Sequence, residues 1–311
     1  MSATKIITGV IVVLAISFIV ISMRTCRTRG EIDATATGDV LMSYVKGIEG
    51  NSPVGRRQYI TNKLKEFDVP FSVMQFDTIL MRSNGRNDTL HGENIIVTMG
   101  VGDNKIVVGA HCDAVPQSPG ANDNGGGVAV VLELVRSLRG TSFNNSIDFC
   151  FFDQEENGLI GSAVYVRLRN PSLKHLAMIN LDVEGTGEEI YVGPVGEGDD
   201  DLIMKYIHEA RDKTKYIYQE SAYYPDSDHE SFGHAKLENI SISVVPKGDA
   251  EKLAKWVQSG FKGFEKPEDT PEVLKVMHSP RDSSTYVFPE ALNMSYVFTK
   301  TTLLLLDEGE Q

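Results

Sequence analysis

Histidine and carboxylate side chains follow several apolar segments of this 311-residue chain, at the points where predicted strands end. His111 closes the apolar run of residues 107–110, and Asp113 lies two residues further along. Because side chains alternate between the two faces of a strand, His111 and Asp113 point to the same side. The imidazole could bind a metal ion through one nitrogen while Asp113 holds the other. Taken alone, this pair is equally compatible with a structural histidine.

Carboxylates occupy the same kind of position further along the chain. Asp123 precedes the glycines of residues 125–127 and a predicted helix, so it could cap that helix or bind a ligand. Glu155 and Glu156 follow the apolar strand of residues 146–152. A charged pair is costly to bury there unless it binds something, although a solvated loop is the alternative.

Two more residues complete the set of candidate ligands. Asp182 closes the apolar strand of residues 175–183, and His278 lies in a later turn. Two histidines and three or four carboxylates form a mixed nitrogen and oxygen donor set that suits Zn²⁺. Such a set can hold two metal ions about 3.5–4 Å apart with one carboxylate bridging them, and the pair of ions lowers the pKa of a bridging water to about 7.

The segments that must position these residues alternate between strands and helices. Short β-branched or alternating runs predict strands, and apolar residues at helical spacing predict helices between them. The predicted strands are residues 71–80, 94–99, 105–110, 146–152 and 175–183, and the predicted helices are residues 38–67, 128–138, 201–212 and 289–306. This alternation predicts an α/β fold with a mixed, largely parallel central sheet and helices on both faces. In such a sheet, ligands bind at the carboxyl ends of the strands.

Composition excludes several classes of protein. Hydrophobic residues make up 41% and charged residues 23% of the chain, which are ordinary proportions for a globular protein. The formal net charge of −13 would repel phosphate backbones, so we expect no nucleic acid partner. Three cysteines without a CxxC pair form neither a disulfide framework nor a thiolate metal site.

Residues 1–30 are predicted to lie outside the domain that residues 31–311 form. Residues 6–23 are an uncharged run of 18 residues, with Lys5 before it and Arg24 after it. At about 1.5 Å per residue, a helix of this length nearly spans the hydrocarbon core of a membrane. A cleaved signal peptide is the alternative, but no small-x-small cleavage site directly follows the run, where Arg24 lies instead. We therefore expect a transmembrane anchor, and the arginines after it favour a cytoplasmic position for the domain.

Taken in order, these segments make the chain resemble the zinc-dependent aminopeptidases of the M28 metallopeptidase family. The resemblance covers roughly residues 40–305 and rests on the order and spacing of five ligand positions, because each single motif is weak. The motifs are His111-x-Asp113, Gly120 to Gly125, Glu155 to Ser162, Leu181-Asp182, Ser227-Asp228-His229 and His278 to Asp282.

The resemblance implies a centre with two zinc ions that removes N-terminal residues from peptides. His111 and Asp182 would hold one ion, Glu156 and His278 would hold the other, and Asp123 would bridge them. The expected partner is therefore a peptide with a free N-terminus. Digestion of peptides is a role that suits an exported enzyme, so we expect the catalytic domain outside the cytoplasm. The arginines after residue 23 favour the opposite orientation. The sequence indicates no oligomeric state.

Three more residues receive roles from the same resemblance. Asp113 would orient the ring of His111. Glu155 would act as the general base, taking a proton from a metal-bound water and passing it to the leaving amine. A tyrosine before the Ser-Asp-His triplet polarises the scissile carbonyl in this family, and spacing favours Tyr224 over Tyr223 for that role.

Two other functions are compatible with the same fold. A glutaminyl cyclase-like acyltransferase shares the Phe-Phe-Asp-x-Glu-Glu segment, but the Gly158 to Ser162 stretch directly after it is more typical of peptidases. A non-catalytic, membrane-anchored binding ectodomain is the alternative from another class, since fold alone does not imply activity. All the expected ligands and the base are present, which argues against that alternative.

Overall fold

The computed structural model describes residues 34–81, 87–196, 201–264 and 266–310, and the described residues from Thr35 onward form one compact unit. The predicted membrane anchor at residues 6–23 lies outside the described residues. Among the residues that are described, no helix is long and apolar enough to cross a membrane.

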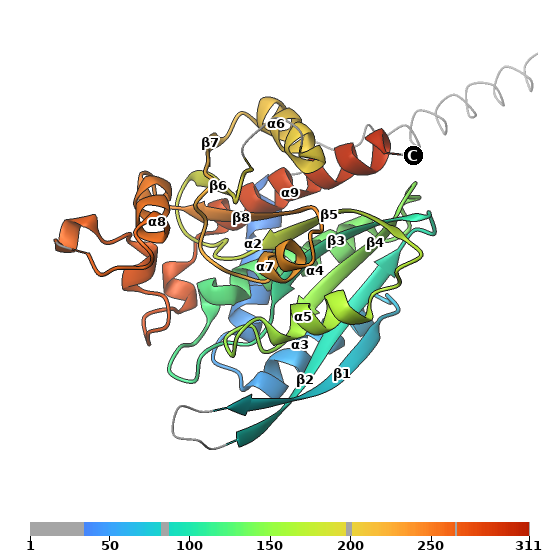
Figure 1. The fold of residues 1–311 in the computed structure, drawn as a ribbon, viewed down its shortest axis with the longest axis horizontal. Coiled ribbons are helices and arrows are strands. Elements are labelled where there is room, and N and C mark those ends of the chain that lie inside the picture. The colour runs from blue at the N-terminus through green and yellow to red at the C-terminus, as the bar shows by residue number, and fades with distance from the viewer. Residues whose placement is uncertain (1–33, 82–86, 197–200, 265, 311) are drawn as a thin grey trace, which may run out of the picture. The chain divides into compact units, whose positions relative to one another are not determined.

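A sheet of eight strands forms the centre of the described fold (Figure 1). Its strands lie in the order β1-β2-β4-β3-β5-β8-β6-β7. Their bounds are β1 (Ser72–Met81), β2 (Asn87–Met99), β3 (Asn104–His111), β4 (Ser146–Phe152), β5 (Lys174–Leu181), β6 (Glu189–Gly193), β7 (Ile217–Glu220) and β8 (Asn239–Val245). The four central strands β4, β3, β5 and β8 are parallel to one another. The pairs β1–β2, β2–β4 and β8–β6 are antiparallel, and β7 pairs with β6 in parallel fashion. The predicted mixed, largely parallel sheet is therefore confirmed.

Helices cover both faces of this sheet (Figure 1). Their bounds are α2 (Ala34–Ile48), α3 (Pro53–Glu66), α4 (Gly127–Leu138), α5 (Ile160–Leu168), α6 (Leu202–Thr214), α7 (His229–His234), α8 (Asp249–Gln258) and α9 (Pro289–Gly309). A π-helical turn, η1 (Ala121–Gly126), precedes α4, and short 3-10 turns lie at η2 (Pro267–Asp269), η3 (Val273–Lys275) and η4 (Ser284–Tyr286). Adjacent residues of one strand join different clusters: Val108 packs with α2, α4 and α9, and Val107 packs with α5 and α7. The central strands are thus buried on both faces, as their continuous apolar runs require.

The helical pattern of residues 38–67 is divided into two helices. Gly50 adopts a positive φ of 68°, which ends α2, and Ser52 then caps α3 by accepting a hydrogen bond from the backbone N–H of Gly55. Pro53 at the first position of α3 has no N–H to leave unpaired. The break lets α3 change direction and contact both β2 and α4.

Candidate metal centre

The candidate ligands meet because the strands that carry them are parallel neighbours. His111 is the last residue of β3, and Asp182 directly follows the last residue of β5, which pairs with β3. The glutamates Glu155 and Glu156 follow β4, which pairs with β3 on its other side. The carboxyl ends of these three strands therefore bring the side chains to one edge of the sheet.

One group of candidate ligands surrounds His111, whose side chain is only 1% exposed. Its Nε2 lies 3.2 Å from Asp123 Oδ1 and 3.5 Å from Asp182 Oδ1. Donor atoms of these three residues all lie within 4.8 Å of one another, which is compact enough to hold one metal ion.

A second group surrounds His278, whose side chain is 49% exposed. Its Nε2 lies 3.0 Å from Asp123 Oδ2 and 3.1 Å from Glu156 Oε2. Asp123 thus presents one oxygen to each histidine, which is the arrangement of a bridging carboxylate. Glu155 belongs to the same cluster, since it offers a donor atom within 4.8 Å of donor atoms of His111 and Glu156.

The pKa values of the histidines indicate that the carboxylates of this cluster attract positive charge. Hydrogen bonds to Asp123 and Glu156 raise the pKa of His278 to about 10. Burial lowers the pKa of His111, but the carboxylates around it raise that pKa well above its ordinary value. Burial alone would raise the pKa of Asp123, yet its hydrogen bonds to the two imidazoles bring that pKa below its ordinary value. Protons on the two histidines therefore offset part of the negative charge of the carboxylates in the metal-free protein.

Buried carboxylate oxygens of the candidate ligands show whether a metal ion would fit the site. Glu156 Oε1 is buried and has no hydrogen-bond partner among the described residues, and buried Asp182 Oδ1 has only its 3.5 Å ion-pair contact with His111. A buried carboxylate oxygen without a partner is costly, and coordination of a cation would remove that cost. The imidazole and carboxylate donors present at both groups match the ligand preferences of Zn²⁺.

Asp113 supports the cluster in two ways. Its Oδ1 lies 3.5 Å from Nδ1 of His111, where a carboxylate can orient the ring. Its two oxygens also accept hydrogen bonds from the backbone N–H groups of Glu155 (3.1 Å) and Glu156 (3.2 Å). The sequence predicted the first contact but not the second, which fixes the glutamate-bearing loop.

Asp282 holds the loop that carries Asp123, a role that the sequence analysis did not assign. It is fully buried and accepts hydrogen bonds from the backbone N–H groups of Asn122 (2.7 Å) and Asp123 (3.2 Å). Asn122 in turn accepts a hydrogen bond from the backbone N–H of Gly185 (2.7 Å), and Asn124 donates to the backbone carbonyl of Leu181 (2.8 Å). The two asparagines therefore tie the bridging loop to the end of β5.

Tyr224 lies beside Asp182 but points its hydroxyl elsewhere. The hydroxyl is hydrogen-bonded to Ser243, and the ring stacks on Tyr191 with 4.7 Å between centroids. Burial raises the pKa of Tyr224 well above its ordinary value. The expected contact of this hydroxyl with a scissile carbonyl stays a prediction.

Tyr224 instead lines a small cavity next to the candidate ligand Asp182. The cavity has a volume of about 70 Å³, and Asp182 is one of its walls. Its other walls are mostly apolar and include Val183, Leu253, Trp256, Leu274 and Met277.

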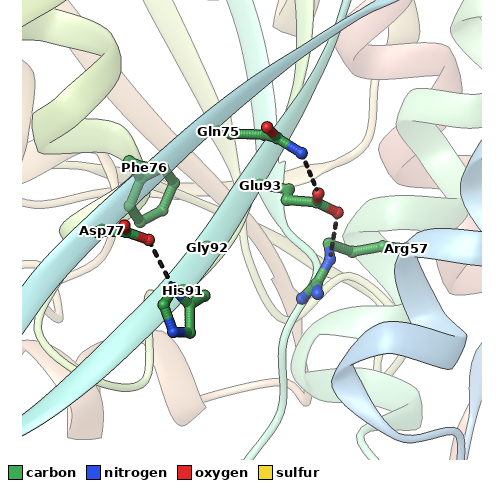
Figure 2. Close-up of a pocket in the computed structure, with 7 residues that line it drawn as sticks. All are labelled: Arg57, Gln75, Phe76, Asp77, His91, Gly92 and Glu93. Atoms are coloured by element: carbon green, nitrogen blue, oxygen red, sulfur yellow. Dashed lines mark hydrogen bonds and ion pairs between the residues drawn. The ribbon is translucent and has the colours of Figure 1, made fainter.

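A larger open pocket of about 400 Å³ lies on the β1–β2 hairpin (Figure 2). Figure 2 shows Glu93 between Gln75 and Arg57, with Arg57 Nε 3.2 Å from Glu93 Oε2. Arg57 also contacts Asp153, with 2.8 Å between Nη1 and Oδ2, and Asp153 lies two residues before Glu155. None of the predicted ligands lines this pocket, and its connection to the glutamate loop runs through Arg57 and Asp153.

Comparison with curated proteins finds aminopeptidases. The chain is 32% identical over 196 residues to the aminopeptidase YwaD of Bacillus subtilis (strain 168), covering 61% of this chain and 38% of that protein. It is 32% identical over 108 residues to leucine aminopeptidase 2 of Trichophyton rubrum, covering 34% of this chain and 22% of that protein. The matched part of the chain thus spans about two fifths or less of these relatives.

Comparison with solved structures finds the same fold. A zinc aminopeptidase from Bacillus subtilis superposes with a TM-score of 0.67 at 17% identity, covering 86% of this chain and 94% of that one. A glutaminyl cyclase from Bacteroides thetaiotaomicron superposes with a TM-score of 0.63 at 19% identity, covering 89% and 97%. The sequence model of peptidase family M28 matches residues 94–297, which include every candidate ligand. The chain therefore belongs to peptidase family M28.

Proposed function

We propose that this protein is a zinc-dependent metallo-aminopeptidase that removes N-terminal residues from peptides. The observation that carries the proposal is the position of Asp123, whose two oxygens lie against His111 and His278 at 3.2 Å and 3.0 Å. Membership of family M28 and the similarity to proteins named as aminopeptidases support the same function.

Two zinc ions would be held by the two groups of ligands. His111 and Asp182 would bind one ion, Glu156 and His278 the other, and Asp123 would bridge them. Zinc bound there would polarise a peptide carbonyl and lower the pKa of a water molecule, so that hydroxide becomes available near neutral pH.

Glu155 is the side chain that we assign to proton transfer. Burial raises the pKa of Glu155 well above its ordinary value, which suits a carboxyl that must both accept and donate a proton near neutral pH. It would take a proton from the attacking water and deliver that proton to the leaving amine. The hydrogen bond from its backbone N–H to Asp113 would keep it oriented during both steps.

The cavity beside Asp182 supports a preference for apolar N-terminal residues. A substrate whose scissile bond lies at the metal ligands would place the side chain of its first residue in this cavity. Burial of an apolar side chain against Val183, Leu253 and Leu274 would contribute about 25 cal/mol of binding free energy for each Å² of apolar surface removed from water. The volume of about 70 Å³ favours an aliphatic side chain of moderate size.

Peptides with free and with acetylated N-termini test this function directly. The zinc-loaded protein should hydrolyse leucine-initiated peptides with a free amine, lose activity with a chelator and regain it with zinc. Elemental analysis should find about two zinc ions per chain. One zinc ion per chain together with cyclisation of glutamine-initiated peptides would favour the cyclase alternative. A zinc-loaded protein that turns over neither substrate would favour the binding ectodomain.

The location of the enzyme is inferred from the sequence alone. We propose that residues 6–23 anchor it in a membrane with the catalytic domain outside the cytoplasm. The uncharged run of 18 residues supports the anchor. Protease added to intact cells should remove the catalytic domain if this orientation holds, whereas protection of the domain would reverse it.

A further inference from the structure

Arg56 of α3 is the largest fully buried side chain of the described fold and belongs to neither group of metal ligands. Its guanidinium donates hydrogen bonds to the backbone carbonyls of Cys112 (2.6 Å), Ile48 (3.5 Å), Pro119 (3.3 Å) and Gly120 (3.2 Å). Both terminal nitrogens reach the carbonyl of Gly120. A buried guanidinium carries a high desolvation cost, and hydrogen bonds to carbonyls offset this cost only in part.

Three of the four carbonyls that Arg56 binds, those of Cys112, Pro119 and Gly120, belong to segments that carry candidate metal ligands. Cys112 lies between His111 and Asp113 at the end of β3. Gly120 lies three residues before Asp123, and its carbonyl also accepts a hydrogen bond from the N–H of Gly125 (3.0 Å), which closes the turn around Asp123. One guanidinium therefore connects the strand end that bears His111 to the loop that bears the bridging carboxylate.

The local backbone is shaped to admit this side chain. Gly120 has a φ of +66°, and a Cβ atom at this position would lie 2.9 Å from Nη1 of Arg56. Glycine is therefore required there both for the backbone conformation and for the approach of the guanidinium. The carboxylates that act on the charge of Arg56 are those of Asp113, Asp123 and Asp282, which surround the metal centre.

We propose that Arg56 is a positioning residue of the metal centre, which holds the Asp123 loop in register with His111 through carbonyls on both segments. The inference rests on the proposed zinc site. Asp282 binds the amide groups of this loop and Arg56 binds its carbonyls, so the loop is fixed from both sides before a metal arrives. Residues that orient metal ligands in this way typically contribute 10–100-fold to metal affinity, and we expect a loss of about that size when Arg56 is replaced.

Two substitutions of Arg56 separate positioning from charge and from simple stability. Arg56→Lys keeps the positive charge but cannot span both segments, and Arg56→Met removes the charge as well. Arg139→Lys is the control for loss of an arginine–carbonyl contact, because Arg139 is exposed and donates to the backbone carbonyl of Phe67 (3.3 Å), away from the candidate ligands. Zinc affinity of the metal-free, full-length variants is measured by competition with a chromophoric chelator, and thermal midpoints record their stability.

The expected result is a loss of about 10–100-fold in zinc affinity for both Arg56 variants and no change for the Arg139 variant. The visible spectrum of the cobalt-substituted Arg56→Lys protein should also change, because the geometry of the bridging ligand changes. Parental zinc affinity in folded Arg56→Lys or Arg56→Met overturns the inference while leaving the proposed function intact. A parental protein that binds no zinc overturns both.

Hydrogen exchange on the parental protein tests the inference without a substitution. If the loop is fixed in advance, the N–H groups of Asp123 and Gly125 are already protected in the metal-free protein, at a level close to that of β3. Protection that develops only after zinc is added would mean that the metal, and not Arg56, orders the loop.

Discussion

Zinc binding should release protons, and the number of protons can be worked out from the contacts of the two histidines. In the metal-free protein, Nε2 of His278 lies 3.0 Å from Asp123 and 3.1 Å from Glu156, and these contacts raise its pKa to about 10. The pKa of His111 is also raised well above its ordinary value. Both rings are therefore protonated near pH 7.5. Each zinc ion needs the lone pair of Nε2 of its histidine, so the two histidines must lose about two protons when both ions bind, and ionisation of a zinc-bound water would add at most one more.

Isothermal titration of the metal-free protein with zinc measures this number. The titration is repeated in two buffers that bind no zinc and have different ionisation enthalpies, and the difference in heat gives the proton count. Because zinc competes with protons whose pKa is raised, the apparent affinity increases with pH until the pH exceeds these pKa values. One proton released per zinc ion changes the apparent affinity for each ion by about tenfold per pH unit, and the overall constant for loading both ions by about 100-fold, or about 2.7 kcal/mol.

Two substitutions make this result specific. His278→Gln should lower the count by about one proton, since one protonated ligand is removed. His208→Gln is the control, because His208 pairs with Glu220 on the exposed surface at 2.9 Å and does not touch the cluster. A count below one proton in the parental protein would refute the reasoning, because the histidines would then be neutral before zinc binds or would not be ligands.

Four further results are expected. Glu155→Gln should keep its zinc but lose about 10²–10⁴-fold in kcat, and parental turnover would show that Glu155 is not the base. Asp123→Ala should empty both zinc positions together, so full loading of that variant would argue against a bridge. Leu253→Ala should shift kcat/KM about tenfold toward larger side chains at the first substrate residue, and an unchanged preference would place that side chain elsewhere. During slow chelation the zinc ion at His278, which is 49% exposed, should leave before the ion at His111, which is 1% exposed; simultaneous loss would contradict this order.

That the candidate ligands lie together could be predicted from the sequence, because their positions depend on strand ends. Apolar runs of strand length end at His111 and just before Asp182, and parallel strands bring such ends to one edge. The pairing of the hairpin could not be predicted in the same way. Residues 87–93 of β2 are mostly polar, so no apolar pattern marks them, although they continue the strand and pair with β1. Their strand conformation comes from the partner strand and not from burial.

Residues that support the site were missed for a different physical reason. Asp282 and Arg56 bind backbone atoms of segments that are remote in sequence, and a backbone amide or carbonyl has no residue type that a pattern could reveal. The direction of the Tyr224 hydroxyl could not be predicted either, since it depends on the position of Ser243, its hydrogen-bond partner. Side-chain types therefore predict which residues can bind a metal, and only the packed structure reveals which residues hold the backbone beneath them.

These backbone contacts explain how a cluster rich in carboxylates can exist without its metal. Mutual repulsion of Asp123, Glu156 and Asp182 would separate the loops that carry them if only the side chains were in contact. Protons on the two histidines reduce this repulsion, but they can do so only while the backbone keeps each imidazole between two carboxylates. Asp113 fixes the glutamate loop through two amides, and Asp282 fixes the Asp123 loop through two more. Metal ions would then replace protons in a site whose backbone is already in place. Zinc affinity therefore depends on these backbone hydrogen bonds as well as on the ligands.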